Sequence, residues 1–442
     1  MKKDLTTFAA KILFLMTIIS IASCSRKEMD TTDILNEKTA KEDIRAAKFT
    51  RAMQTARDAA RLLDGESITR AEYDRQIDEN EIKFIVADNA TRSDAEPDTL
   101  MYVFNYMDDA GFAVVSAVGE SGEMLAVTEQ GHFNSMEEIE NEGFRIFMEA
   151  ATVYTDSLRW AEKEATRGGG QTGPEYLEDY MVIIDTVAAY YPPLISTCWE
   201  QGRPYNEFCP YDDGIQCPTG CVAIAVGQIL GYHEYPTCWM LGYLNGNPEI
   251  NVDWSSLKSQ STCSLCTSYY FCTDHIPLAI ILRQIGFLAN MNYDANGSCT
   301  TDDWAKTALS HLGYNTSNVI NYSFDYVKYS IEMGRPLYMG ASRCVNDIID
   351  GHAWVIDGYS ETIYTYYCYS KPHNFLTWTL ENTLVYTYRY NHINWGWGGD
   401  CNGFFSSNCF NTQSGSYDTG CSHLHDVNFT FNFKIIYNIY KQ

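Results

Sequence analysis

The chain has 442 residues, of which 45% are hydrophobic and 14% aromatic, so it can bury a sizeable core and is long for a single domain. Its formal net charge of −26 at pH 7 argues against nucleic acid as a partner, because binding phosphates needs clustered lysine and arginine. The same charge argues against a polybasic contact with a membrane. We therefore interpret the acidity as a solubility feature without catalytic meaning.

The N-terminus has the pattern of an export signal. Lys2 and Lys3 precede an apolar run over residues 12–22 that is too short to span a bilayer. The run ends in Ile-Ala-Ser-Cys, as in bacterial lipoproteins, so residues 1–24 are predicted to be a signal peptide and Cys24 the lipidated residue. The alternative is an ordinary cleaved signal peptide with an incidental cysteine. Both predict an exported protein, lipid-anchored to the cell envelope or outer surface in the first case and secreted in the second.

The cysteines divide the rest of the chain. Of 15 cysteines, none lies between Cys24 and Cys198, although the last part of the chain is rich in them. This predicts a cysteine-free module over residues 25–170, beginning with a polar tether, and a second module over residues 171–442. A glycine triplet directly after Arg167 predicts a flexible link between them that is open to proteolysis.

The pattern of apolar residues predicts the main elements. In chain order these are a helix over 46–64, strands over 82–86 and 100–130, a helix from a Ser135–Glu138 capping box to about residue 165, a buried helix from 221 to about 231, and helices over 276–287 and 302–312. The last third of the chain alternates β-branched, aromatic and polar residues, which predicts an antiparallel sheet. A helical half followed by a β half is an α+β layout.

Cys221 is the first candidate for catalysis. It directly follows Pro-Thr-Gly at the start of the predicted buried helix, where a helix carries partial positive charge and unpaired N–H groups. Both favour the thiolate, which is the nucleophilic form of cysteine. The alternative for such a position is an inert buried cysteine or one held in a disulfide.

A nucleophilic cysteine needs a base within hydrogen-bond reach, and His352 is the candidate because it follows a glycine at the start of a predicted strand. The alternative is a half-buried structural histidine, and the same holds for His392. Asn394 is placed to orient an imidazole by a hydrogen bond. Trp395 or Trp397 is placed to shield that bond from water, although an aromatic-rich hairpin would look similar.

Gln201 is a candidate for stabilising negative charge. It lies shortly before Cys221, and its side-chain amide together with the Cys221 backbone N–H could hold an oxyanion. The alternative is a glutamine that simply faces solvent. The candidates follow one another in the order glutamine, cysteine, histidine and asparagine-tryptophan.

That order and the strings "TGCVAIAVGQILGYHEYP", "GHAWVIDG" and "NWGWGG" resemble the streptopain family of papain-like cysteine peptidases over about residues 190–410. The string "GFAVVSAVGESGEMLAVTEQGHF" resembles the inhibitory prosegment of the same family. The resemblance implies a papain-like catalytic domain over 171–442, with a helical half and an antiparallel β half. It also implies an α+β prodomain within 25–170.

Carried over by position, the resemblance implies a site made of Cys221 as nucleophile, His352 as base, Gln201 at the oxyanion, Asn394 and Trp395 closing off the histidine, and Gly351 and Ser298 as contacts to the substrate backbone. It implies no metal and no cofactor. The expected partners are protein or peptide substrates and the chain's own prodomain as inhibitor. The expected function is that of an exported cysteine endopeptidase made as a zymogen.

Some features depart from that family. Residues 359–390 are an insertion that either extends a hairpin or overhangs the cleft. The many cysteines predict disulfides in an exported chain, although a zinc site at Cys263, Cys266 and Cys272 is an alternative that lacks a second pair of ligands. A thiol oxidoreductase, a peptidase-like transferase and a non-enzymatic surface lipoprotein on a protease fold are the rival functions.

Overall fold

The computed structural model describes residues 31–64, 75–87, 98–119, 122–167, 178–240, 249–259, 276–345, 348–372, 377–410 and 430–442. The leader with Cys24 and the triplet after Arg167 lie outside these ranges. Within them, no helix combines the length and the apolar character needed to cross a membrane.

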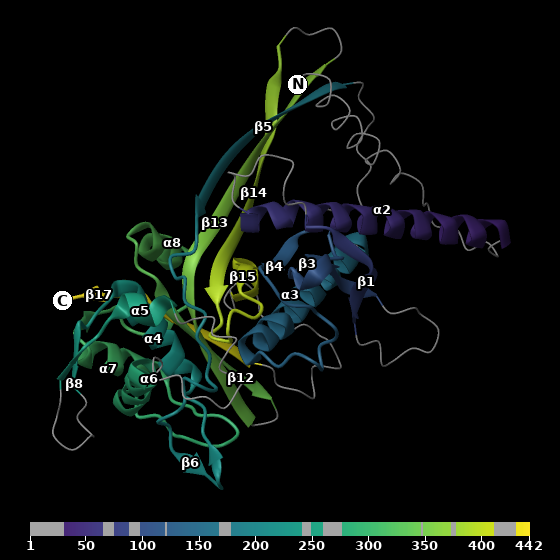
Figure 1. Ribbon diagram of the computed structural model, residues 1–442. Helices are drawn as coiled ribbons and strands as arrows, with labels where there is room; N and C mark the ends of the chain where they lie inside the picture. The colour runs from purple at the N-terminus through teal and green to yellow at the C-terminus, as the bar shows by residue number, and fades with distance from the viewer. Residues whose placement is uncertain are drawn as a thin grey trace.

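The N-terminal module is an antiparallel sheet between two helices (Figure 1). Its elements are α2 (Thr31–Asp64), β1 (Ile77–Val86), β2 (Thr99–Tyr106), the 3-10 turn η1 (Met107–Asp109), β3 (Phe112–Ser116), β4 (Met124–Thr128) and α3 (Glu142–Arg167). Successive side chains of a strand point to opposite faces, so Tyr102 and Phe104 pack with α2, whereas Met101 and Val103 pack with α3. The predicted helix over 46–64 and the predicted strands are confirmed.

Helix α3 begins later than its sequence signals indicate. The capping box predicted a start at Ser135, but the helix begins at Glu142. Asn141 Oδ1 accepts a hydrogen bond from the Phe144 backbone N–H at 3.1 Å, which satisfies one of the unpaired donors of the first turn. The Asn141 side chain also donates to the Asp400 carbonyl at 3.1 Å, so this cap joins the helix start to the second module.

The second module contains helices followed by a large antiparallel sheet, as the sequence predicts. Its longer elements are β5 (Glu178–Tyr191), α4 (Cys221–His233), α5 (Trp254–Ser259), α6 (Ile276–Leu288), α7 (Asp302–His311), α8 (Phe324–Glu332), β12 (Leu337–Val345), β13 (Ile348–Pro372), β14 (Thr379–Asn394), β15 (Gly403–Ser406) and β16 (Thr430–Ile436). Its shorter elements are β6 (Tyr211–Asp212), β7 (Ile215–Gln216), β8 (Cys238–Met240), β9 (Glu249–Asn251), β10 (Tyr314–Asn315), β11 (Ile320–Asn321), η3 (Ser407–Phe410) and β17 (Tyr440–Lys441).

Two helical layers cover the two faces of this sheet. Helix α4 is apolar on all sides and is buried from Val222 to Gly231, as expected of a helix inside a core. It packs with α6 and α7 against the face of β13 that carries Ala353 and Val355. Helix α3 of the N-terminal module packs against the opposite face, where Trp354 lies. The sheet of the second module therefore lies between two layers, its own helices on one face and α3 of the first module on the other.

The two modules share one continuous sheet. Strand β4 pairs with β15 in antiparallel register, with Val127 opposite Phe404, and the sheet order runs β1-β2-β3-β4-β15-β14-β13-β12-β16-β11. The backbone groups of β4 and β15 thus satisfy one another across the boundary between the modules. This ladder fixes how α3 sits on the second module.

Strands β13 and β14 form a long hairpin that rises away from the body, with β5 along one side (Figure 1). The described residues of the insertion, 359–372 and 377–390, lie in or beside this hairpin, so the insertion extends a hairpin, which was one of the two expectations. Strand β5 pairs with β13 from Tyr191 opposite Tyr359 to Glu178 opposite Pro372. This three-stranded arm exposes large apolar side chains, among them Val187 at 60%.

Candidate active site

Cys221 is the first residue of α4 and is half-buried, as the sequence predicts. The preceding Gly220 has φ +87°, a conformation that side chains rarely adopt. A Cβ atom there would lie 2.7 Å from Cε of Met291 and 3.0 Å from the Ser298 carbonyl oxygen. The Ser298 hydroxyl donates to the Pro218 carbonyl at 2.7 Å. The turn before Cys221 is thus held tightly by the loop that carries Ser298.

The loop with Gln201 lies against the same helix start. The Gln201 carbonyl accepts hydrogen bonds from Thr219 N at 3.0 Å and from Thr219 Oγ1 at 3.3 Å. Trp199 in this loop is fully buried, and a Cβ atom on Gly231 of α4 would lie 3.0 Å from its ring. Glycine at 231 therefore permits the close approach. The Gln201 backbone is thus bonded to the turn that directly precedes Cys221.

His352 lies on β13 opposite Ala341 and is buried. Its Nε2 is 3.0 Å from the carbonyl oxygen of Trp395. Because a carbonyl only accepts hydrogen bonds, Nε2 is the donor in this pair. The other ring nitrogen, Nδ1, is buried and makes no hydrogen bond to any of the described residues. It lies 3.7 Å from Oε2 of Glu142 in α3.

The surroundings of His352 favour its charged form. Burial opposes the charge, but the Cys221 sulfur, the Glu142 carboxylate and the Trp395 carbonyl together raise the pKa of His352 to about 10. An imidazolium beside a thiol stabilises the thiolate. The site therefore places an imidazole whose charged form is favoured beside the Cys221 sulfur.

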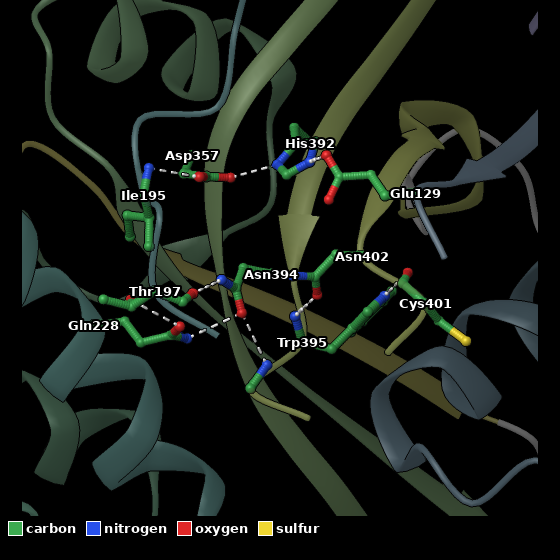
Figure 2. A network of polar contacts seen from close by, with 11 residues as sticks. Glu129, Ile195, Thr197, Gln228, Asp357, His392, Asn394, Trp395, Cys401 and Asn402 are labelled. Carbon is green, nitrogen blue, oxygen red and sulfur yellow. Dashed lines mark hydrogen bonds and ion pairs between the residues drawn. The ribbon is translucent and has the colours of Figure 1, made fainter. Parts of the chain in front are cut away.

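Asn394 does not contact the imidazole. Its Nδ2 donates to the Thr197 carbonyl at 2.7 Å. Its Oδ1 accepts from Gln228 Nε2 and from the Gly396 backbone N–H, both at 3.1 Å (Figure 2). The bond that orients the histidine comes instead from the carbonyl of the next residue, Trp395. The sequence pointed to the right hairpin but to a different acceptor.

Trp395 closes the site from the side of β14. It is fully buried, its ring centroid is 4.8 Å from that of Trp354, and its indole N–H donates to the Cys401 carbonyl at 2.9 Å. Its backbone N–H donates to Asn402 Oδ1 at 3.0 Å. Gly351, directly before the histidine, is exposed at the strand opposite Ser342.

The start of α3 covers His352. A Cβ atom on Gly143 would lie 2.6 Å from the imidazole Cδ2 and 2.5 Å from Cε3 of Trp395. Glycine is therefore needed for the helix backbone to approach this closely. Together with the Glu142 carboxylate, this places the first turn of α3 on the histidine.

A second buried histidine bridges the modules, a role that the sequence does not predict. His392 on β14 lies with Nδ1 2.6 Å from Asp357 and Nε2 3.2 Å from Glu129, which follows β4 (Figure 2). Burial opposes its charge, but the two carboxylates raise the pKa of His392 to about 9. Asp357 also accepts from the Ile195 backbone N–H at 2.9 Å. No sequence spacing indicates this bridge, because its members are far apart in the chain.

Glu123 provides a further polar contact between the modules. Its Oε1 accepts from Asn408 Nδ2 at 3.1 Å, and its Oε2 accepts from Tyr154 OH at 3.1 Å. Burial raises the pKa of this carboxyl. The interface thus holds carboxylates in three distinct settings, at Glu123, Glu129 and Glu142.

The predicted disulfides are not found among the described cysteines. Free thiols occur at Cys198, Cys209, Cys217, Cys221, Cys299, Cys368, Cys401 and Cys409. The part of the chain that the structure describes contains no group of histidine, cysteine and acidic side chains that could hold a metal ion. The zinc alternative at Cys263, Cys266 and Cys272 lies outside the described residues.

Comparison with known proteins identifies two domains in this chain. Residues 199–405 match the peptidase C10 family, and residues 40–154 match the Spi protease inhibitor. Streptopain of Streptococcus pyogenes is 26% identical over 347 residues, which cover 71% of this chain and 75% of that protein.

Two further relatives come from other bacteria. The thiol protease/hemagglutinin PrtT of Porphyromonas gingivalis is 25% identical over 354 residues, covering 73% of this chain but 35% of that protein. A prointerpain A fragment of Prevotella intermedia is 20% identical, with a TM-score of 0.48, and covers 77% of this chain and 96% of that chain.

The fold is thus α+β and papain-like, with a helical half and an antiparallel β half preceded by an α+β module. The chain therefore carries a peptidase C10 family domain over residues 199–405, preceded by a Spi protease inhibitor domain over residues 40–154, and is a homologue of streptopain.

Proposed function

We propose that this protein is an exported cysteine endopeptidase made as a zymogen, with Cys221 as nucleophile and His352 as base. Residues 25–170 are its tether and inhibitory prodomain, and residues 171–442 are the peptidase. The family match supports a peptidase. The position of Cys221 at a helix N-terminus, next to a histidine whose charged form is favoured, supports the assignment of roles.

In this mechanism the Cys221 thiolate attacks the scissile carbonyl carbon and forms a carbon–sulfur bond. The oxyanion accepts hydrogen bonds from the Cys221 backbone N–H and from the Gln201 side chain. The His352 imidazolium gives its proton to the leaving amine as the peptide bond breaks. His352 then takes a proton from water, which hydrolyses the thioester and restores the thiolate.

The substrate backbone would pass between Gly351 and Ser298. Gly351 directly precedes His352 and is exposed, and the Ser298 loop supports the turn before Cys221. The two therefore flank the reacting groups from the sheet side and from the helix side. Substrates are proteins or peptides, and the mechanism needs no metal and no cofactor.

The contact of α3 with His352 is the observation that carries the zymogen proposal. Glu142 Oε2 lies 3.7 Å from the same ring nitrogen that must serve Cys221 and the leaving group. The Gly143 backbone packs on the imidazole and on Trp395. A helix in this position competes for the base and fills the space next to it, so the prodomain must leave before substrate can bind.

The proposal is tested with full-length protein. We expect the wild type to convert itself to a shorter form that begins near residue 170 and cleaves peptides. Cys221→Ala and His352→Ala should remain folded, full length and inactive. An electrophilic cysteine-protease probe should label Cys221 only after conversion. Wild-type turnover by Cys221→Ala would overturn the assignment.

Export is tested separately. Labelled palmitate should enter the wild-type protein in bacterial cells and should not enter a Cys24→Ala variant. Label in Cys24→Ala would refute the anchor at this residue and leave the peptidase assignment untouched.

A further inference from the structure

Gln228 lies about two turns after Cys221 on α4, on a helix whose other buried residues are apolar apart from glycine. It is fully buried. A buried amide is costly unless its donor and its acceptor are both satisfied. Its position inside the core therefore depends on the partners that it finds.

Both ends of the Gln228 amide are used. Nε2 donates to Asn394 Oδ1 at 3.1 Å, and Oε1 accepts from Thr197 Oγ1 at 3.2 Å. The ring of bonds closes because Asn394 Nδ2 donates to the Thr197 carbonyl at 2.7 Å (Figure 2). Thr197 and Asn394 are almost completely buried. We call these three residues the Gln228 ring.

One branch of the Gln228 ring leads to the base. Asn394 Oδ1 also accepts from the Gly396 backbone N–H at 3.1 Å, so the amide spans the residue between them, Trp395. The Trp395 carbonyl is the acceptor of the His352 Nε2–H bond at 3.0 Å. The position of this carbonyl, and hence of the imidazole, depends on how Asn394 is held.

The other branch leads to the oxyanion loop. Thr197 lies a few residues before Gln201, with Trp199 between them packed against Gly231 of α4. The Gln201 carbonyl in turn accepts from Thr219 at the turn before Cys221. The Gln228 ring is therefore the point at which the nucleophile helix, the oxyanion loop and the hairpin that holds the base are joined by side-chain hydrogen bonds.

From this geometry we propose that Gln228 is a positioning residue, which sets the distance between the nucleophile helix and the base through Asn394 and the Trp395 carbonyl. Asn394 acts in the same ring without touching the imidazole. The inference rests on the proposed peptidase function. The alternative is a purely structural role, in which the hydrogen bonds of the Gln228 ring stabilise the core but do not affect kcat or its pH dependence.

A variant of Gln228 distinguishes the positioning role from the structural role, because only the positioning role predicts a change in the pH dependence of activity. Gln228→Met keeps the size and removes both hydrogen bonds, so Asn394 loses one of the three bonds that hold it and the Trp395 carbonyl becomes free to shift. The carbonyl is one of the groups that raise the pKa of His352, so its displacement lowers that pKa. Because the active ion pair is lost when the imidazolium loses its proton, the alkaline limb of activity should move to lower pH.

The experiment uses self-processed enzyme and a peptide amide substrate, with kcat, KM and their pH dependence as readouts. For Gln228→Met we expect kcat to fall roughly tenfold or more, KM to stay within about twofold, and the alkaline limb to shift to lower pH. Thr197→Val should act in the same direction, and Thr197→Ser, which restores the hydroxyl, should recover the wild-type profile. This pair tests the proposal even if Gln228→Met fails to fold.

Ser330→Ala is the matched control, because Ser330 is a fully buried hydrogen-bonding side chain on α8, away from the site. It should lower thermal stability without changing kcat or the pH profile. If Gln228→Met and Thr197→Val behaved like this control, the positioning role would be refuted while the peptidase assignment stood. If the wild type were inactive on peptides and its Cys221 unreactive, the proposed function would fail and this inference with it.

Discussion

Gly143 of α3 and His352 of β13 are in direct contact, at a distance that leaves no room for a side chain: a Cβ atom on Gly143 would lie 2.6 Å from the imidazole Cδ2. The contact joins the backbone of the inhibitor-type module to the proposed base. It makes one glycine of the prosegment a sensitive probe of the proposed inhibition.

We expect Gly143→Ala to weaken inhibition. The added methyl group meets the imidazole and the Trp395 ring, both of which are held in the core, so the helix start must move away. Inhibition of the mature enzyme by the isolated segment, added in trans, should weaken about tenfold or more, or ~1.4 kcal/mol. Glu164→Ala, an exposed change near the other end of α3, should inhibit like the wild type. Equal inhibition by Gly143→Ala and wild type would contradict the contact.

The His392 bridge predicts a pH dependence of the precursor. The pKa of His392 is raised from 6.5 to about 9, so its stabilising contribution is complete below pH 6.5 and is lost as the pH rises through about 9. Its hydrogen bond to Glu129 lowers the pKa of that carboxyl from 4.5, so the contribution of Glu129 is present above pH 4.5 and lost as the pH falls. The bridge should stabilise most between these limits.

The measurement is urea unfolding of full-length Cys221→Ala, which cannot process itself, between pH 6 and pH 10. Its free energy of unfolding should fall on the alkaline side, and the fall should be smaller in a Glu129→Gln background. His311→Asn, at an exposed histidine, should leave the slope unchanged. An identical slope with and without Glu129 would show that the bridge does not couple protonation to stability.

Gly220→Ala should damage the site through the backbone. With φ +87° and ψ 139° a side chain is strained by about 1–3 kcal/mol, and the new Cβ atom would also meet Met291 and the Ser298 carbonyl. We expect a lower melting temperature and a larger fall in kcat/KM than the stability loss explains, because Cys221 follows directly. Gly202→Ala, where a Cβ atom would meet no neighbour, should be close to neutral in stability. Full activity of Gly220→Ala would argue against a constrained turn.

Four buried cysteines should behave as thiols. Alkylation in denaturant without reductant should modify Cys209, Cys217, Cys401 and Cys409. In the folded protein these residues should react slowly, because burial raises the pKa of Cys209, Cys401 and Cys409 and keeps those thiols protonated. A mass lower by two hydrogens and resistance to alkylation in any pair would restore the disulfide prediction that the structure does not show.

The sequence predicted those elements whose signals are local. The apolar run after Cys221 indicates a buried helix, and α4 begins at that residue. Alternation along the last third of the chain indicates strands, and the inserted segment continues the β13–β14 hairpin. Such patterns involve residues that are close in the sequence, so they predict helices and strands without knowledge of the tertiary contacts.

The relationships that cross the chain could not be predicted in the same way. Asn394 is a reasonable partner for His352 by residue type, but the acceptor is the Trp395 carbonyl, and every residue carries a carbonyl. The capping box at Ser135 competes with Asn141, which gains a second bond to Asp400 only in the folded protein. Tertiary contacts therefore determine both the acceptor for His352 and the start of α3.

Removal of the prosegment during maturation would expose one edge of the sheet. In the precursor, the backbone of Gly403 to Phe405 is paired with β4, and the neighbouring strand on its other side is β14. Departure of the prosegment would turn β15 into a border strand whose N–H and C=O groups face water or another chain. Long, flat edge strands can pair with strands of other proteins. A strand of only 4 residues offers few backbone groups for such pairing. The short length of β15 would thus let a matured enzyme lose β1 to β4, four strands of an 11-stranded sheet, without gaining an edge that pairs readily with other chains.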